Sequence, residues 1–135
     1  RNNAFDTHVH QNNLHQRLLS YASDAVAGFF DDMKRIDRAD DVTMMIFSEF
    51  GRRVPENTSL GTDHGTANHV YVIGKNVIGG HYGQPPSLTE LDEGDNFAFT
   101  TDFRRVYATI IEEWMGYDQS EKILRKKFKT LGMFS

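Results

Sequence analysis

The sequence predicts an α/β fold with a mainly parallel sheet and flanking helices, and three observations indicate this class. Apolar residues recur at three- and four-residue intervals over residues 14–36, which is typical of an amphipathic helix. Residues 42–47 then form a short, continuous apolar run, as expected for a strand covered on both faces. Residues 4–7 precede the helix and resemble the end of another strand. Together the three segments predict one right-handed β-α-β unit.

Loops and further strands are predicted after this unit. Residues 51–66 are rich in Gly, Asn, Thr, Pro and charged residues and show no periodicity, so they should form a loop at the carboxyl end of a strand. Such loops carry binding sites in open α/β sheets. Residues 69–73 are predicted to form another buried strand, and residues 84–96 to be irregular surface.

Two helices are predicted in the last third of the chain. Residues 102–115 show helical spacing of apolar side chains. Thr100 or Thr101 is expected to cap this helix, Asp102 to favour its first turn, and Gly116 to end it. The basic segment 120–129 is also predicted to be helical, with its charges on a solvated face.

Length and composition predict a single α/β domain over residues 1–135, which we expect to be the C-terminal part of a longer chain. Its 39% hydrophobic and 25% charged residues are typical of a soluble globular protein. The net charge of −4 argues against a nucleic-acid partner, because binding phosphates needs a basic face. No apolar run is long enough to span a membrane. The absence of cysteine excludes disulfides, thiolate metal sites and cysteine nucleophiles.

Candidate metal ligands lie just beyond the predicted strands and in the Gly-rich loop. Carboxylate and imidazole groups suit zinc, manganese or iron. Because neighbouring parallel strands end at the same sheet edge, these side chains should converge on a divalent metal ion. We expect His8 and His64 to bind it with Asp6, and Glu49 to lie nearby. The candidate metal-binding residues are Asp6, His8, His10, Glu49, Asp63 and His64.

Each candidate also has a structural alternative. Asp6 could cap the following helix, Glu49 could pair with a neighbouring arginine, and His64 could hydrogen-bond within its loop. Convergence of all three favours the metal site. His15 is expected to lie on the polar, solvated face of the long helix.

Arg52 is a candidate anion-binding residue, because a guanidinium group matches the geometry of phosphate and sulfate. A salt bridge to Glu49 or Glu56 is the alternative. The catalytic nucleophile remains unassigned, because no side chain can be singled out among Ser48, Thr58, Ser59 and Thr62.

Five short blocks, taken in order, give the chain a family resemblance. They are Phe-Asp-Thr-His at residues 5–8 followed by Gln11, Ser-Glu-Phe-Gly-Arg at 48–52, Gly-Thr-Asp-His-Gly at 61–65, Gly-Gly at 79–80 and Thr-Thr-Asp at 100–102. With these blocks the sequence resembles the bacterial family catalogued as domain of unknown function 1501, which is grouped with the alkaline phosphatase and sulfatase superfamily. The resemblance covers residues 5–116.

The resemblance implies an alkaline-phosphatase-like sheet in which two metal ions bind an ester. Asp6 with His8 or His10 then resembles the ligand pair of one metal, and His64 its distal histidine. Glu49 resembles a ligand facing the second metal, although phosphatases commonly carry an Asp-His pair there. The superfamily spacing fits His10, whereas the nearer family pattern favours His8, which we prefer.

The implied function is that of the C-terminal part of a metal-dependent hydrolase of phosphate or sulfate esters. The resemblance further implies a zinc-like or manganese cofactor, an exported or periplasmic location, and a nucleophile from an N-terminal half. The alternative is a non-catalytic domain that binds metal or an anionic partner. In both cases the isolated chain should expose apolar surface, which the N-terminal half or self-association would cover.

Overall fold

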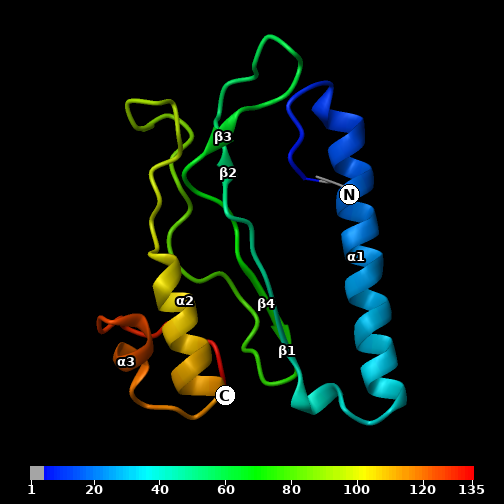
Figure 1. The fold of residues 1–135 in the computed structure, drawn as a ribbon, viewed down its shortest axis with the longest axis vertical. Coiled ribbons are helices and arrows are strands. Elements are labelled where there is room, and N and C mark those ends of the chain that lie inside the picture. The colour runs from blue at the N-terminus through cyan, green and yellow to red at the C-terminus, as the bar shows by residue number, and fades with distance from the viewer. Residues whose placement is uncertain (1–4) are drawn as a thin grey trace.

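The computed structural model describes residues 5–135 (Figure 1). The long helix α1 lies on one side, the strands lie in the middle, and α2 and α3 lie on the other side. The elements in chain order are α1 (Gln11–Arg35), the 3-10 turn η1 (Ala39–Asp41), β1 (Thr43–Ile46), β2 (Gly51–Arg52), β3 (His64–Gly65), β4 (Tyr71–Gly74), α2 (Phe103–Thr109), the π-helical turn η2 (Ile110–Trp114) and α3 (Ser120–Leu124).

The prediction of a mainly parallel, alkaline-phosphatase-like sheet is wrong. Within residues 5–135 the strands form two antiparallel two-stranded sheets, one of β1 with β4 and one of β2 with β3. Thr43 lies opposite Gly74 in the first sheet, and Arg52 lies opposite His64 in the second. Strands form in both segments predicted from apolar runs, but residues 5–7 form none, and residue 4 lies outside the described residues.

The physical reason for the antiparallel arrangement is a chain reversal at residues 53–63. A parallel pair needs a long crossover, whereas a simple loop returns the chain in the opposite direction. The loop brings β3 back along β2 and then β4 back along β1, so the two sheets form one interrupted hairpin (Figure 1). Asn68 bridges the interruption, because its Nδ2 donates to the carbonyl oxygens of Ser48 and Phe50 at 2.8 and 3.0 Å.

Helix α1 begins at Gln11 and ends at Arg35, close to the predicted bounds. Lys34 and Arg35 lie in its last turn, where positive charge interacts favourably with the helix dipole. The expected packing of this helix on a sheet is not found, because none of its residues, all of which the structure describes, is buried. Its apolar stripe is only half-buried at Leu18 and Phe30.

The core lies around α2 and the C-terminal segment. Its buried side chains are those of Val106, Ala108, Phe128 and Met133, with Thr109 and Ser120 fully enclosed. Thr109 connects α2 to the C-terminal segment, because its hydroxyl donates to the Arg105 carbonyl oxygen and accepts from the backbone N–H of Leu131.

The ends of the C-terminal helices differ partly from the prediction. Asp102, and neither of the two threonines before it, caps α2 by accepting a 2.9 Å hydrogen bond from the N–H of Arg104. The helical path continues through η2 and ends before Gly116, whose φ of 69° suits glycine. Helix α3 stops at Leu124 instead of reaching residue 129, because Arg125 adopts a left-handed conformation.

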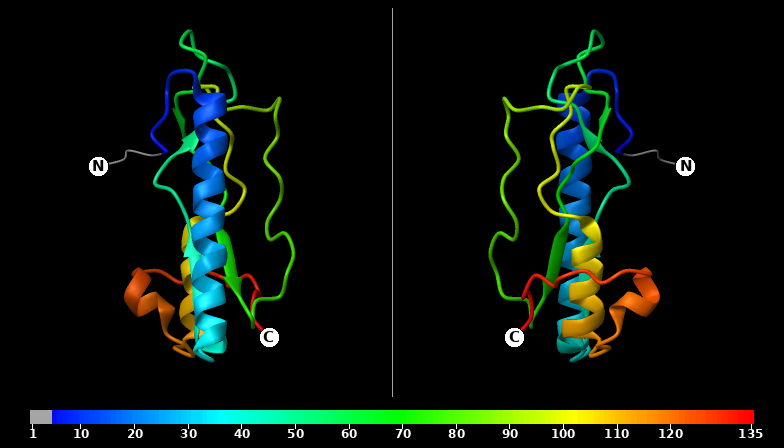
Figure 2. Two further views of the ribbon diagram at one scale, coloured as in Figure 1. Left: turned by 90° about the vertical axis from the view of Figure 1, so that its right-hand side faces the viewer. Right: turned by 90° about the vertical axis from the view of Figure 1, so that its left-hand side faces the viewer.

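Residues 75–102 form an extended, irregular segment, the first part of which Figure 2 shows away from α1. The Asp92 carboxylate holds one turn of this segment by accepting from the N–H groups of Gly94 and Asn96 at 2.8 and 2.9 Å. This agrees with the irregular surface predicted for residues 84–96. Among the described residues, no helix is both long and apolar enough to cross a membrane.

Candidate metal centre

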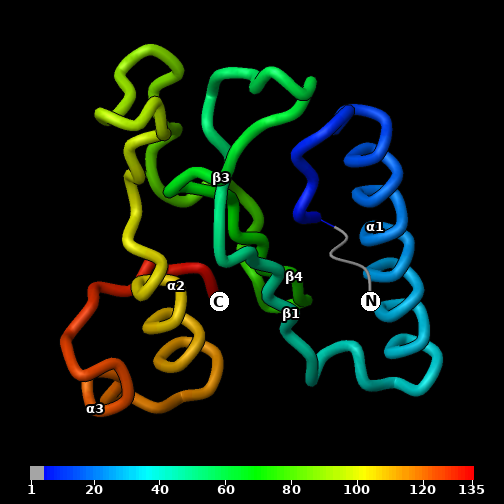
Figure 3. The backbone as a smooth tube through the Cα atoms, turned by 45° about the horizontal axis from the view of Figure 1, so that its top comes forward, coloured from blue at the N-terminus to red at the C-terminus, as the bar shows by residue number. Residues whose placement is uncertain are grey.

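The segment before α1 meets the loop that closes the hairpin, and the candidate site forms between them (Figure 3). The backbone N–H groups of His10 and Gln11 donate to the carbonyl oxygens of Ser59 and Leu60, each at 2.9 Å. Gly61 permits this close approach, because a Cβ atom there would lie 2.4 Å from the carbonyl oxygen of His8. The backbone contacts therefore set the position of His8 against the loop.

Asn57 organises the loop from within. Its Oδ1 accepts from the N–H groups of Ser59 and Gly61 at 2.9 and 3.1 Å. Its Nδ2 donates to the carbonyl oxygen of His8 and to Oδ1 of Asp63, both at 3.1 Å. Asn57 was not among the residues predicted from the sequence to form the site, although an Asn in a Gly- and Thr-rich loop is a signal for this kind of turn.

Three side chains converge at this junction. Oδ1 of Asp6 lies 3.0 Å from Nε2 of His8 and 2.7 Å from Nε2 of His64, and the two Nε2 atoms are 3.1 Å apart. Ligands bound to one tetrahedral zinc at 2.0–2.2 Å are about 3.3–3.6 Å from one another. The three atoms therefore form a triangle slightly smaller than one face of a zinc coordination shell. If the three side chains moved slightly outward, the triangle would accommodate a metal ion.

The triangle is partly exposed to solvent. The side chains of Asp6, His8 and His64 are 41%, 41% and 43% exposed. Three protein ligands with an accessible further position are typical of a catalytic metal site, whereas structural sites are closed by four ligands. The donor set of one carboxylate and two imidazoles suits zinc or manganese.

His64 is held in place by the β2–β3 pair and by an aromatic neighbour. It occupies the first position of β3, opposite Arg52. The ring of Phe50 stacks on the His64 ring with centroids 3.8 Å apart and planes 7° from parallel. Phe50 was part of the block that carried the family resemblance, but its contact with His64 was not predicted.

Hydrogen bonds favour the ionised form of both nearby carboxyl groups. The bond with His64, supported by one with His8, keeps the pKa of Asp6 below its ordinary value. The bond from Asn57 is the main cause that lowers the pKa of Asp63. Anionic carboxylates beside two imidazoles form an electrostatic environment that attracts a cation.

The remaining predicted ligands lie outside this triangle. Within residues 5–135, the group of side chains close enough to share a metal ion contains Asp6, His8 and His64. His10 precedes α1 in a left-handed conformation, and Glu49 lies exposed between β1 and β2. Asp63 contacts the far nitrogen of His8, with 3.5 Å between its Oδ1 and Nδ1 of the ring.

Arg52 contacts backbone on both sides of the site. Its Nη1 donates to the carbonyl oxygen of Thr62 at 2.7 Å, and its Nη2 donates to that of Phe5 at 2.6 Å. Burial lowers its pKa, and the charges of Asp6 and Asp63 oppose this effect. The salt bridges to glutamate considered as an alternative do not occur among the described residues. Anion binding by Arg52 stays a prediction.

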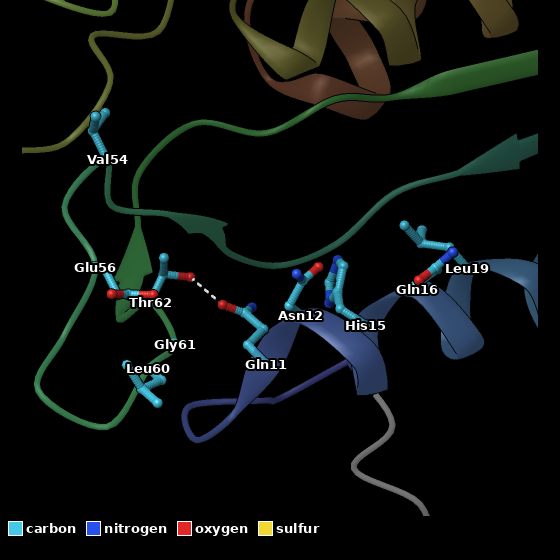
Figure 4. A pocket seen from close by; sticks show the side chains of 10 residues that line it. All are labelled: Gln11, Asn12, His15, Gln16, Leu19, Val54, Glu56, Leu60, Gly61 and Thr62. Carbon is cyan, nitrogen blue, oxygen red and sulfur yellow. Dashed lines mark hydrogen bonds between the residues drawn. The ribbon is translucent and has the colours of Figure 1, made fainter.

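A pocket of about 490 Å³ adjoins the site between the first turns of α1 and the loop (Figure 4). Gln11 and Thr62 meet at its edge through a 2.8 Å hydrogen bond. His15 lines the pocket and is half-buried, so the prediction that it is solvated is wrong. Its ring packs edge-on against Phe5, and burial lowers its pKa. The lining residues are Gln11, Asn12, His15, Gln16, Leu19, Val54, Glu56, Leu60, Gly61 and Thr62.

The described residues thus combine helices on both sides of an antiparallel hairpin with a candidate metal-binding triad. Residues 1–127 match the family model described as "Protein of unknown function (DUF1501)". The chain therefore belongs to this family. Neither the curated proteins nor the solved structures contain a significant match.

Proposed function

We propose that this chain is the metal-binding part of a metal-dependent hydrolase of phosphate or sulfate esters. The observation that carries the proposal is the triangle formed by Oδ1 of Asp6 and the Nε2 atoms of His8 and His64, with separations of 2.7–3.1 Å. Three potential ligands from two distant chain segments converge here in the exposed arrangement expected of a catalytic metal site.

The ester substrate is proposed from the resemblance to the alkaline phosphatase and sulfatase superfamily. The same resemblance supports an exported protein and a nucleophile from another part of it. A bound zinc-like or manganese ion would polarise the ester and stabilise developing negative charge. Asp6, His8 and His64 would hold the ion, and the positive charge of Arg52 nearby would favour an anionic substrate.

Metal binding can be tested by calorimetric titration with zinc and manganese, combined with elemental analysis. The wild type should bind one ion, whereas His8→Ala and His64→Ala should each lose at least about tenfold in affinity, because each removes a ligand. His81→Ala is the matched control, since it removes a histidine outside the triangle, and it should bind as the wild type does. Equal affinity of all four proteins would contradict the metal site.

A non-catalytic metal-binding domain is the second candidate. This candidate needs no nucleophile, and none is assigned within residues 5–135, where the hydroxyl of Thr62, one of the four potential nucleophiles, donates to Oε1 of Gln11. Hydrolysis of aryl phosphate and aryl sulfate by the metal-loaded, complete gene product separates the two candidates. Turnover that disappears in His64→Ala would favour the hydrolase, and metal binding without turnover would favour the second candidate.

A further inference from the structure

We infer that Asp63 orients His8 and is not itself a metal ligand. This inference rests on the proposed function, because it assumes that the triad holds a metal ion. The two ring nitrogens of His8 have different neighbours: Nε2 lies 3.0 Å from Oδ1 of Asp6, whereas Nδ1 lies 3.5 Å from Oδ1 of Asp63. The lone-pair directions of the two nitrogens diverge, so Asp63 lies on the edge of the ring that faces away from the triangle.

Asp63 is well placed to hold the ring, because its own position is restrained twice. The N–H of Arg53 donates to its carbonyl oxygen at 3.0 Å and extends the β2–β3 ladder. The Nδ2 of Asn57 donates to its carboxylate at 3.1 Å. The same Nδ2 donates to the carbonyl oxygen of His8, so one amide group fixes both members of the Asp63–His8 pair.

The chemical consequence concerns which nitrogen of His8 carries hydrogen. Without metal, Nε2 of His8 is the atom that hydrogen-bonds to Asp6. If a metal ion took the place of that hydrogen, the carboxylate beside Nδ1 would favour hydrogen on Nδ1 and leave the lone pair of Nε2 for the ion. Metal-binding histidines commonly donate their second N–H to a carboxylate, which fixes the ring and increases its basicity. Asp63 plays this part for His8, while stacking on Phe50 restrains His64.

The test compares zinc binding by the wild type, Asp63→Asn and Asp95→Asn. Asp95→Asn is the matched control, because a carboxylate oxygen of Asp95 also lies 3.5 Å from a side-chain nitrogen, that of Arg53, but Asp95 contacts none of the three proposed ligands. Zinc affinity should fall about 10–100-fold in Asp63→Asn and stay unchanged in the control. In the zinc-loaded wild type, nitrogen NMR should show hydrogen on Nδ1 of His8 and zinc on Nε2.

Each outcome decides between the two proposals. If the wild type binds zinc through Nδ1 of His8, or if Asp63→Asn binds zinc as tightly as Asp95→Asn, the role of Asp63 is overturned while the metal site stands. If the wild type binds no zinc, both proposals fail. The NMR result on the wild type does not depend on whether the Asp63 variant folds.

Discussion

At the scale of single residues, Arg52 joins the two segments that carry the metal ligands. Its guanidinium group donates to the carbonyl oxygen of Phe5, next to Asp6, and to that of Thr62, two positions before His64. A hydrogen bond to a charged group contributes about 1.5–3 kcal/mol. Arg52→Ala should therefore weaken zinc binding roughly tenfold or more, because the two segments lose their common contact. Arg52→Lys should have a smaller effect, since an ammonium group can still reach one carbonyl.

The control for this prediction is Arg53→Ala, which removes the adjacent arginine. The side chain of Arg53 hydrogen-bonds to Gly94 and Asp95, and its bond to Asp63 is made by the backbone N–H, which alanine keeps, so zinc affinity should stay close to wild type. Calorimetric titration measures all three variants. If Arg52→Ala binds zinc normally but loses affinity for inorganic phosphate or sulfate, Arg52 is instead the anion-binding residue that the sequence predicted.

At the scale of secondary structure elements, Asp102 determines how α2 begins. Its carboxylate accepts from the N–H and the guanidinium group of Arg104, and the side-chain bond is the main cause that lowers its pKa from 3.8 to about 2. Asp102→Ala should reduce the free energy of unfolding by about 1 kcal/mol, as expected for a lost N-cap. Asp102→Asn should retain most of this stability, because its oxygen can still accept the backbone bond.

The pH dependence of this contribution has a defined sign. The Asp102 carboxyl group has a lower pKa in the folded protein than in the unfolded chain. Its contribution to the free energy of unfolding is therefore complete above about pH 4. It is lost as the pH falls toward 2. Urea unfolding should therefore show a difference between wild type and Asp102→Ala at neutral pH that shrinks on acidification. A difference that grows on acidification would contradict this account.

At the scale of the whole molecule, the chain exposes much apolar surface. Helix α1, which has no buried residue, presents Leu14, Leu19, Tyr21 and Phe29 at 41%, 54%, 66% and 38% exposure. Exposed apolar surface of this kind favours association. The isolated chain of 15.5 kDa should therefore sediment as a larger species. Tyr21→Glu should shift it toward the monomer, and a wild type that sediments as a stable monomer would contradict the prediction.

Local patterns in the sequence were sufficient to predict many elements. Apolar periodicity located α1 and α2, short apolar runs located β1 and β4, and glycine marked the end of η2 at Gly116. These features depend on residues close together in the chain, which is why they could be predicted. Asp6, His8 and His64 were expected to converge at one edge of a parallel sheet. That sheet does not form, but contacts between the segment before α1 and the loop at residues 57–61 bring the three side chains within 2.7–3.1 Å.

Only the tertiary structure decided how these elements meet. An apolar strand can pair in either direction, so the chain reversal at residues 53–63, and not the strand sequence, makes the sheets antiparallel. In the same way, Asp63 and His64 are neighbours in sequence but contact different edges of the His8 ring. The sequence by itself determined which side chains are available for chemistry. Whether each of these side chains contacts a metal ion, a ring nitrogen or the backbone depends on how distant segments meet. Local periodicity carries no information about those contacts.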